Sequence, residues 1–314
     1  MNESKEVGWE RSVIERLAME SVKEARRKRR WSIFFRTLGF AYLGVVIFLF
    51  WNAEGGSARV DGAQHTAMVQ LEGVIGASGE VKAAETIQAL QAAFEAENSK
   101  GVILRINSPG GSPVQAGMIN DEIRRLRAKY PAKPVYAVVE DVCASGGYYI
   151  AAAADKIFVD KASIVGSIGV RMDGFGFTGT MEKLGVERRS ITAGENKAFL
   201  DPFLPQNPKQ VEFAKGMLAE IHQQFIDVVR HGRGKRLKET PEMFSGLFWS
   251  GARSIELGLA DAYGTVDSVA RDVIKAEEIR DYTQRENVAE RLAKRFGAGV
   301  SASVVQELNR LDVK

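Results

Sequence analysis

The sequence predicts an α/β fold with parallel sheets and flanking helices, preceded by one N-terminal transmembrane helix. From residue 66 onwards, short apolar runs typical of buried strands alternate with longer stretches that carry the apolar period of a helix. Strands separated by single helices pair in parallel through right-handed crossovers. A continuous apolar stretch, residues 31–51, precedes this alternating pattern and is long enough to cross a bilayer.

Residues 31–51 have the length and the flanks of a membrane anchor. As a helix they would extend roughly 30 Å at ~1.5 Å per residue, which matches the hydrocarbon core of a bilayer. Arg36 is the only charged residue among them, and Trp31 and Trp51 stand at the two ends, where indole rings favour the headgroup level. A buried helix of a soluble core would need neither these aromatic ends nor the basic run before them.

The charges around this stretch predict its orientation. Residues 23–30, KEARRKRR, are strongly basic, whereas the residues after the stretch are almost neutral, so the N-terminus is expected in the cytoplasm and the rest across the membrane. A cleaved signal peptide is the alternative, but bulky Phe50 and Trp51 stand where cleavage needs small residues. We expect a single-pass protein of the bacterial cytoplasmic (inner) membrane, with a cytoplasmic basic helical arm, an anchor and a linker at 1–30, 31–51 and 52–65.

The elements after the linker follow from apolar spacing and turn residues. Strands are predicted at 66–75, 101–107, 134–140 and 156–160. Helices are predicted at 83–96, 113–130 and 144–154, from 208 to 232, and in two shorter segments that begin near Ala252 and Val266. Residues 66–275 would form one domain, and the charged residues 276–314 a helical C-terminal tail.

The composition excludes several classes of function. With 43 basic and 40 acidic residues, the net charge of +3 is too small to propose nucleic-acid binding. The single cysteine, Cys143, excludes an intramolecular disulfide and any multi-cysteine metal site, and three histidines make a histidine-rich metal site a poor hypothesis. We therefore expect no metal and no other cofactor.

Two glycine-rich turns, each after a predicted strand, are the candidate places for chemistry. In NSPGGS, residues 107–112, the paired glycines can aim backbone N–H groups into a cavity, as an oxyanion hole requires. In ASGGYY, residues 144–149, Ser145 opens a helix and is followed by two glycines. A serine at a helix start is most often an ordinary N-cap, but these glycines let a substrate approach and let the Gly146 N–H face the developing charge.

A serine nucleophile needs a base, and the residues alone leave that base open. His65 lies in the predicted linker, while His222 and His231 lie on or just past a long helix, with no glycine-rich turn beside them. A lysine can be the base only if burial lowers its pKa from ~10.4 towards neutrality, which needs a site shielded from water. Lys197 stands in ITAGENKAFLDPF, a segment of small and apolar residues that suits this demand.

Four motifs together resemble the signal peptide peptidase A family. NSPGGS, ASGGYYIA with Ser145, VGSIGV with Ser167, and the G-x-x-K of residues 194–197 occur in the order and approximate spacing of that family. The chain is similar to its short form over about residues 66–275. The resemblance implies a serine protease with a Ser/Lys dyad and the Clp protease/crotonase-like fold.

The resemblance also implies roles for single residues. Ser145 would be the nucleophile that forms an acyl-enzyme, Lys197 the general base, and Ser167 the residue that hydrogen-bonds the lysine amine. The oxyanion hole would be formed by N–H groups of Gly110, Gly111 and Gly146. The implied substrates are cleaved signal peptides and similar apolar peptides, and the implied assembly is a ring-like homo-oligomer.

Two other functions are compatible with parts of the sequence. A crotonase-type acyl-CoA enzyme would share the fold, but coenzyme A is cytoplasmic and the predicted topology puts the domain outside. A non-catalytic membrane-anchored scaffold would not need the motif residues. The segment GFGFTG, residues 174–179, matches a dinucleotide-binding pattern but leaves too little room for the helix that such a site requires.

Overall fold

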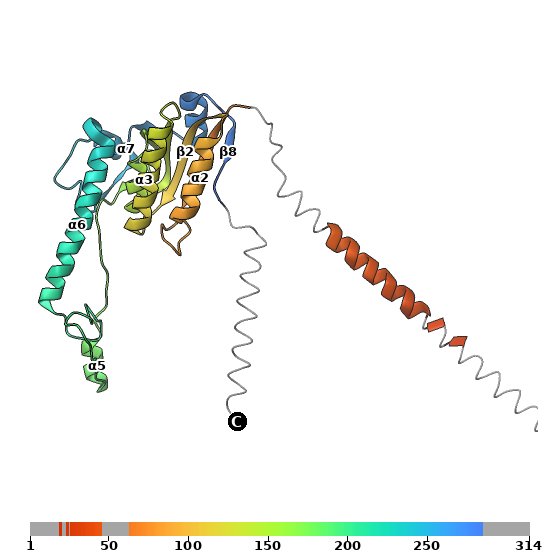
Figure 1. Cartoon of the computed structure of the whole chain (residues 1–314), viewed down its shortest axis with the longest axis horizontal. Helices are drawn as coiled ribbons and strands as arrows, with labels where there is room; N and C mark the ends of the chain where they lie inside the picture. The colour runs from red at the N-terminus through yellow and green to blue at the C-terminus, as the bar shows by residue number, and fades with distance from the viewer. Residues whose placement is uncertain (1–18, 21–22, 25, 46–62, 285–314) are drawn as a thin grey trace, which may run out of the picture. The chain divides into compact units, whose positions relative to one another are not determined.

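The computed structural model describes residues 19–20, 23–24, 26–45 and 63–284 (Figure 1). The chain divides into two units, residues 1–61 and 62–314. In the first unit, residues 26–45 form a helix whose side chains are exposed. No helix within the described residues combines the length and the hydropathy that crossing a membrane requires. Residues 46–51 of the expected anchor and most of the basic arm lie outside the described residues, so the anchor stays a prediction.

The second unit is built on one eight-stranded sheet with the path β6-β5-β3-β2-β1-β8. Strand β4 also pairs with β3, and β7 pairs with β4. All described pairs are parallel except β5–β6, so the predicted α/β class with parallel strands is confirmed. The strands are β1 (His65–Glu72), β2 (Ser99–Ser108), β3 (Val135–Ala144), β4 (Lys156–Val159), β5 (Ile164–Gly166), β6 (Phe248–Ser250), β7 (Ala262–Tyr263) and β8 (Ile279–Asp281).

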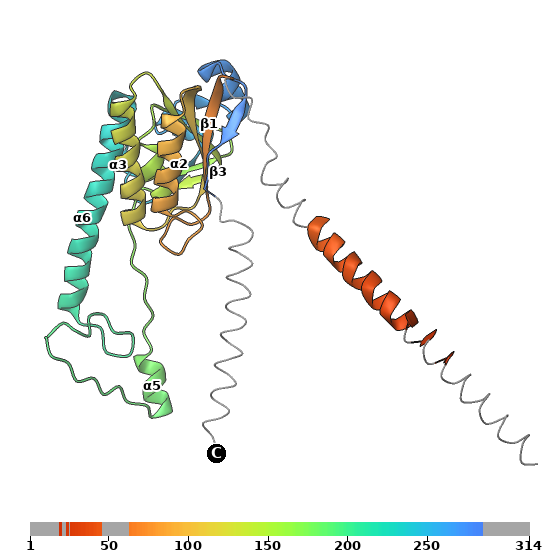
Figure 2. The ribbon, with the colours of Figure 1, turned by 45° about the vertical axis from the view of Figure 1, so that its right-hand side comes forward.

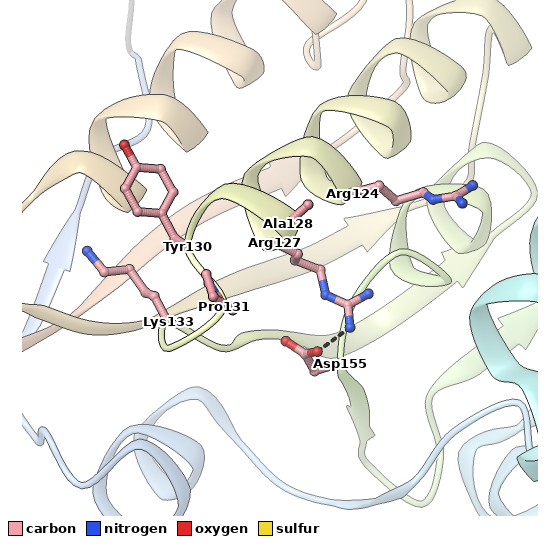
Figure 3. A pocket seen from close by; sticks show the side chains of 7 residues that line it. All are labelled: Arg124, Arg127, Ala128, Tyr130, Pro131, Lys133 and Asp155. Carbon is pink, nitrogen blue, oxygen red and sulfur yellow. Dashed lines mark hydrogen bonds and ion pairs between the residues drawn. The ribbon is translucent and has the colours of Figure 1, made fainter.

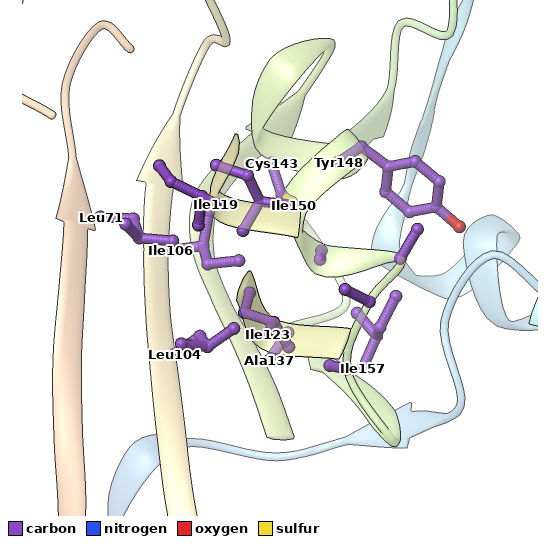
Figure 4. Close-up of a cluster of buried hydrophobic side chains, with 14 of the residues drawn as sticks. Leu71, Leu104, Ile106, Ile119, Ile123, Ala137, Cys143, Tyr148, Ile150 and Ile157 are labelled. Carbon is purple, nitrogen blue, oxygen red and sulfur yellow. The ribbon is translucent and has the colours of Figure 1, made fainter. Parts of the chain in front are cut away.

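Helices cover both faces of this sheet. On one face α2 (Ala83–Glu95), α3 (Pro113–Lys129) and α4 (Gly146–Ala151) enclose the main apolar core, which Figure 4 shows around β2 and β3. A smaller apolar cluster, which includes Ile103 and Phe158, lies beneath the helix η2. The remaining helices are α5 (Thr178–Leu184), α6 (Pro208–Arg233), η1 (Gly234–Arg236), α7 (Gly251–Glu256), α8 (Val266–Ser268) and η2 (Val269–Ile274).

The long helices begin where the sequence supplies a cap. Ser112 precedes α3, and its side chain accepts a hydrogen bond from the Gln115 N–H, with proline at the first helical position. Asn207 caps α6 in the same way, again directly before a proline. Each start therefore has a local physical cause in the sequence.

The structure corrects several predicted boundaries. Strand β3 runs on to Ala144, four residues past the predicted end. Residues 279–281, expected in a helical tail, form β8 and pair with β1, so the domain extends past residue 275. His65, expected in the linker, opens β1 and is buried. Residues 285–314 of the expected tail lie outside the described residues.

Residues 170–207 leave the sheet between β5 and α6. They are called the arm from here on and are distinct from the predicted basic arm at residues 1–30. The arm contains α5, and Figures 1 and 2 both show α5 beyond the N-terminal end of α6, away from the sheet. Helix α6 has 26 residues and is ~39 Å long at ~1.5 Å per residue. Its C-terminal half packs on α4, where the rings of Tyr149 and Phe225 lie 5.1 Å apart. The GFGFTG segment belongs to the arm, and its glycines have open space around them.

Candidate active site

Ser145 stands at the sharp turn between β3 and α4. Its φ is 51° and its ψ is −120°, a backbone conformation that residues with a side chain rarely adopt. The turn is held by hydrogen bonds from Ser145 N–H to the Gly166 carbonyl (2.8 Å) and from Tyr149 N–H to the Ser145 carbonyl (2.9 Å). The side chain makes no capping hydrogen bond to α4. The ordinary N-cap interpretation is therefore wrong, and the hydroxyl is left for another use.

The turn after β2 packs directly against this serine. A Cβ on Gly110 would lie 2.7 Å from both Gly146 N and Ser145 Cβ, so only glycine fits there. The turn is tied to residue 75 by Ile75 N–H to the Gly110 carbonyl (2.9 Å) and Ser112 N–H to the Ile75 carbonyl (2.8 Å). The two glycine-rich motifs, separate in sequence, thus meet in space.

The three expected oxyanion-hole donors differ in availability. Gly110 N–H already donates to Ser108 Oγ at 3.2 Å, and that hydroxyl in turn donates to the Gly73 carbonyl at 2.6 Å. Neither Gly111 nor Gly146 makes an N–H hydrogen bond to another described residue. Gly146 is the first residue of α4, where N–H groups lack partners within the helix. Gly111 and Gly146 thus remain the two candidate donors whose N–H groups are not already used by another described residue.

Ser167 lies beside this turn because β5 pairs with the end of β3. The register matches Ala144 with Gly166, which puts Ser167 next to Ser145 across the pair. Ser167 also has a positive φ, 52°, and its N–H donates to the Leu247 carbonyl at 2.8 Å. Two strained serines thus stand side by side where two strands end.

Lys197 is exposed and stands in a turn of the arm, where its N–H donates to the Gly194 carbonyl at 3.1 Å. The dry setting expected for it is absent from the single chain. Among the described residues, no hydrogen bond joins its amine to Ser145 or to Ser167. One chain does not bring the predicted base to the predicted nucleophile.

Contacts along α6 explain this separation. The arm is fastened to the N-terminal end of α6, where Leu200 N–H donates to Gln210 Oε1 (3.1 Å) and the rings of Phe199 and Phe213 lie 5.9 Å apart. Helix α4, which begins after Ser145, touches α6 at Phe225. Phe213 and Phe225 are twelve residues apart, or about 18 Å along the helix axis.

His222 is a residue near the site for which the sequence offered no signal. It lies on α6, and its Nε2 is 3.1 Å from the Ile168 carbonyl, one residue after Ser167. A bond to a carbonyl requires Nε2 to carry the proton, so His222 positions the segment after β5. Only the packing of α6 against the end of β5 brings it there.

Cys143 lies two residues before Ser145 and is fully buried. Burial raises the pKa of its thiol, so the reactive thiolate is disfavoured. Cys143 is therefore a small buried residue of the core.

Comparisons with known proteins identify a peptidase family. The family model described as peptidase family S49 matches residues 127–280, which include Ser145 and Lys197. The chain is 31% identical over 199 residues to "Putative protease slr0021" of Synechocystis sp., covering 63% of this chain and 69% of that protein. It is 32% identical over 183 residues to "Serine protease SPPA, chloroplastic" of Arabidopsis thaliana, covering 58% and 27%.

Two of the similar proteins do not carry the name of a protease. The chain is 46% identical over 209 residues to "Na(+)/H(+) antiporter NhaA" of Brucella melitensis biotype 1, covering 65% of this chain but only 28% of that protein. Most of that protein lies outside the alignment, so its name carries no argument here. The family model, together with a relative aligned over more than two thirds of its length, establishes that this chain belongs to peptidase family S49.

Proposed function

We propose that this protein is a membrane-anchored serine endopeptidase that degrades cleaved signal peptides and similar apolar peptides. The observation that carries the proposal is Ser145, whose strained backbone leaves its hydroxyl uncapped in a turn that packs against Gly110. The neighbouring Gly111 and Gly146 keep N–H groups that donate to no other described residue. Membership of a peptidase family supports the same reading.

In the proposed mechanism, Ser145 Oγ attacks the scissile carbonyl carbon while a neutral lysine takes its proton. The Gly111 and Gly146 N–H groups and the N-terminus of α4 stabilise the oxyanion that forms. The lysine then gives the proton to the leaving amine, which leaves an acyl-enzyme on Ser145. Water, activated by the same lysine, releases the second product.

The lysine in this mechanism is Lys197 of a neighbouring copy. A general base must lie within about 3 Å of the oxygen whose proton it takes, whereas the contact of Phe199 with Phe213 fastens the segment around Lys197 about 18 Å along α6 from the contact of α6 with α4. The arm also exposes large apolar side chains, among them Phe175 (81% exposed), Leu184 (72%) and Ile191 (100%). Such a surface favours burial against another protein surface, and in a ring of copies each arm would reach the next serine.

The proposed substrates follow from the predicted topology. An anchor at residues 31–51 would keep the catalytic domain close to the membrane, on its extracytoplasmic side, where cleaved signal peptides remain. An apolar peptide would also help to exclude water from the lysine, which must be neutral to act as a base. No cofactor takes part in these steps.

Three variants test the proposal in the full chain in detergent, with an apolar fluorogenic peptide as substrate. We expect Ser145→Ala to lower the turnover number by at least about a thousandfold. Lys197→Ala should lower it by about a hundredfold to ten-thousandfold, as the loss of a general base does. His222→Ala, which changes a positioning residue, should keep activity within about tenfold of the wild type.

Labelling with a fluorophosphonate probe separates chemistry from folding. The probe should modify Ser145 in the wild type and nothing in the folded Ser145→Ala variant. Near-normal turnover by Ser145→Ala would refute the nucleophile, and a loss in His222→Ala as large as that in Lys197→Ala would refute the lysine as sole base. If the wild type neither cleaved the fluorogenic peptide nor reacted with the fluorophosphonate probe, the result would favour the alternative of a non-catalytic membrane-anchored scaffold.

A further inference from the structure

The candidate active site lies at one edge of the sheet, and the cavity in Figure 3 lies at the other. That cavity, of about 380 Å³, is lined by residues that include Tyr130 and Lys133, just before β3, and Asp155, just before β4. Ser145 follows the end of β3, at the edge where the parallel strands β2 and β3 end. Groups that orient the surroundings of Ser145 therefore belong to the strand ends, and one buried serine there has no part in the proposed mechanism.

This serine is Ser108, the last residue of β2, which is fully buried. Its Oγ donates to the Gly73 carbonyl at 2.6 Å and accepts the Gly110 N–H at 3.2 Å. Gly73 follows directly after β1, and its own N–H donates to the Asn107 carbonyl at 3.0 Å. Because a hydroxyl can donate and accept at once, this one side chain ties the turn after β2 to the end of β1.

The turn after β2 is held on both sides of Gly110. Ser108 holds the Gly110 N–H, and the Ile75 N–H holds the Gly110 carbonyl at 2.9 Å. The carbonyl and the following N–H of a trans peptide point in opposite directions, so the Gly111 N–H points away from Ile75. A Cβ on Gly146 would lie 3.2 Å from Gly111 N, so the two candidate oxyanion donors are neighbours.

The glycines of this turn make its shape depend on such contacts. Gly110 and Gly111 have φ angles of 101° and 150°, and without a Cβ they can adopt many other backbone conformations. Removal of the Ser108 hydroxyl would leave the Gly110 N–H and the Gly73 carbonyl without the partner that they have now. The peptide unit before Gly110 would then be free to rotate, and Gly111 would move with it.

We propose that Ser108 is a positioning residue for the oxyanion hole, which keeps the Gly111 N–H directed beside Gly146. The inference rests on the proposed function, because an oxyanion forms only if Ser145 attacks a carbonyl. Ser108 is buried beneath the turn and touches neither the substrate nor the reacting atoms. Its loss should therefore slow the chemical step without weakening the binding of substrate.

Ser108→Ala in the full chain in detergent tests this role, with an apolar fluorogenic peptide as substrate. We expect kcat to fall by about tenfold to a hundredfold, somewhat less than the loss of an oxyanion donor causes. KM should change by less than about threefold, because the lost interaction acts on the transition state. Thermal unfolding of the same samples shows that the variant is folded.

A peptide aldehyde and the matching peptide alcohol report on the oxyanion hole more directly. The O–H of Ser145 adds across the aldehyde carbonyl, and the resulting hemiacetal places the former carbonyl oxygen in the oxyanion hole. The alcohol has no carbonyl and binds without this step. Ser108→Ala should weaken inhibition by the aldehyde by at least about tenfold and leave inhibition by the alcohol unchanged.

Ser163→Ala is the matched control. Ser163 is also buried, and its hydroxyl makes the same pair of bonds, donating to the Glu140 carbonyl at 2.5 Å and accepting the Asp160 N–H at 3.0 Å. It lies just before β5, at the end of that strand opposite Ser167. We expect a loss of thermal stability similar to that of Ser108→Ala, with kcat within about twofold of the wild type.

A second variant covers the case in which Ser108→Ala does not fold. Ser108→Cys keeps the shape of the side chain but makes only weak hydrogen bonds, so it should show the same selective loss of kcat and of aldehyde inhibition, by about threefold or more. Wild-type kcat and aldehyde inhibition in this variant would refute the role of Ser108.

The remaining outcomes separate this inference from the proposed function. If Ser108→Ala kept full turnover, or lost no more than Ser163→Ala, the positioning role would be refuted while the peptidase proposal stood. A higher KM with unchanged kcat would also refute it, because Ser108 would then serve substrate binding. A wild type without turnover on the peptide would contradict the proposed function itself.

Discussion

Ser145 and Ser167 both hold positive φ angles, and the glycines packed around them, Gly110, Gly111 and Gly166, do so as well. Such conformations cost energy in residues with a side chain and persist only where the surrounding structure enforces them. Here the enforcing contacts are backbone hydrogen bonds to Gly166 and Leu247, at the ends of β5 and before β6. The strain is thus local, and it presents the Ser145 hydroxyl instead of using it as a cap.

Gly110→Ala tests this local fit. The new Cβ would lie 2.7 Å from Gly146 N and from Ser145 Cβ, so the turn has to move away from Ser145. We expect turnover to fall by at least about a hundredfold, comparable with the loss of an oxyanion donor. Peptide hydrolysis measures the loss of turnover, and thermal unfolding shows whether the substitution also destabilises the fold.

Gly117→Ala is the matched control for that substitution. Gly117 lies within α3, and a Cβ there meets nothing within 4 Å. Replacing a helical glycine by alanine in open space should stabilise the protein by up to about 1 kcal/mol and leave turnover unchanged. If both alanine variants kept full activity, the close fit of residue 110 against Ser145 would have no catalytic meaning.

Arg233, the last residue of α6, connects that helix to the sheet through Asp261. Its side chain is fully buried; Nη1 lies 2.8 Å from Asp261 Oδ2, and Nε donates to the Gly258 carbonyl at 2.8 Å. The same carboxylate accepts from Ile157 N–H in β4 at 2.7 Å. One aspartate therefore joins the end of α6, the start of β7 and the central sheet.

Removing this carboxylate should destabilise the domain strongly. Asp261→Ala leaves the Arg233 charge buried without its partner, which costs about 3–5 kcal/mol of unfolding free energy. Asp173→Ala, which removes an exposed partner of Arg171 on the arm, should change it by less than about 0.5 kcal/mol. Urea unfolding of both variants measures the difference, and equal small effects would show that the buried pair adds nothing.

The pH dependence of the same pair has a defined sign. Burial alone would raise the pKa of Asp261, but the hydrogen bond and charge of Arg233, with Ile157 N–H and Arg236, lower it below the ordinary 3.8. A carboxylate whose pKa is lowered by folding adds stability above its unfolded-state pKa, and this stability is lost as pH falls through the folded-state value. The cost of Asp261→Ala should therefore shrink as the pH falls below about 4.

The elements differ in how well the sequence predicts them, for physical reasons. The helices α2, α3 and α6 and the strands β1 to β3 are long enough to show a period and begin or end at caps and turns. Strands β5 to β8 have two or three residues each, and their pairing partners alone make them strands. No local pattern could reveal β8 in residues 279–281, because only its bonds to β1 define it.

The candidate site also has parts that the sequence could predict and parts that it could not. The two glycine-rich motifs follow strands that are adjacent and parallel, so their meeting at one edge of the sheet was predictable. The placement of Lys197 was not, because it depends on where the arm is fastened along α6. His222 belongs to a helix face, and only the packing of α6 against the end of β5 shows what it adjoins.

At the scale of the whole molecule, a single copy carries the proposed nucleophile and the proposed base without a described contact between them. The proposed dyad thus makes the assembly the catalytic unit, with Ser145 from one copy and Lys197 from the next. The exposed apolar side chains of the arm fit this arrangement, since a contact with the neighbouring copy would cover them.

Mixed assemblies of two inactive variants test whether the dyad forms between copies. When Ser145→Ala and Lys197→Ala chains are co-expressed in equal amounts and mix at random, about one site in four receives both an intact serine and an intact lysine, because each is drawn with a chance of about one half. We expect about a quarter of the wild-type turnover per chain, and each variant alone should be inactive. A dyad within one chain predicts no activity at any mixing ratio. As a control, each variant is purified and assayed alone, and the two are then denatured and refolded together, which distinguishes true mixing from residual activity. Two different affinity tags show that the refolded assemblies contain both chains. Turnover that stays at the level of the separate variants in such assemblies would refute a base supplied by the neighbouring copy.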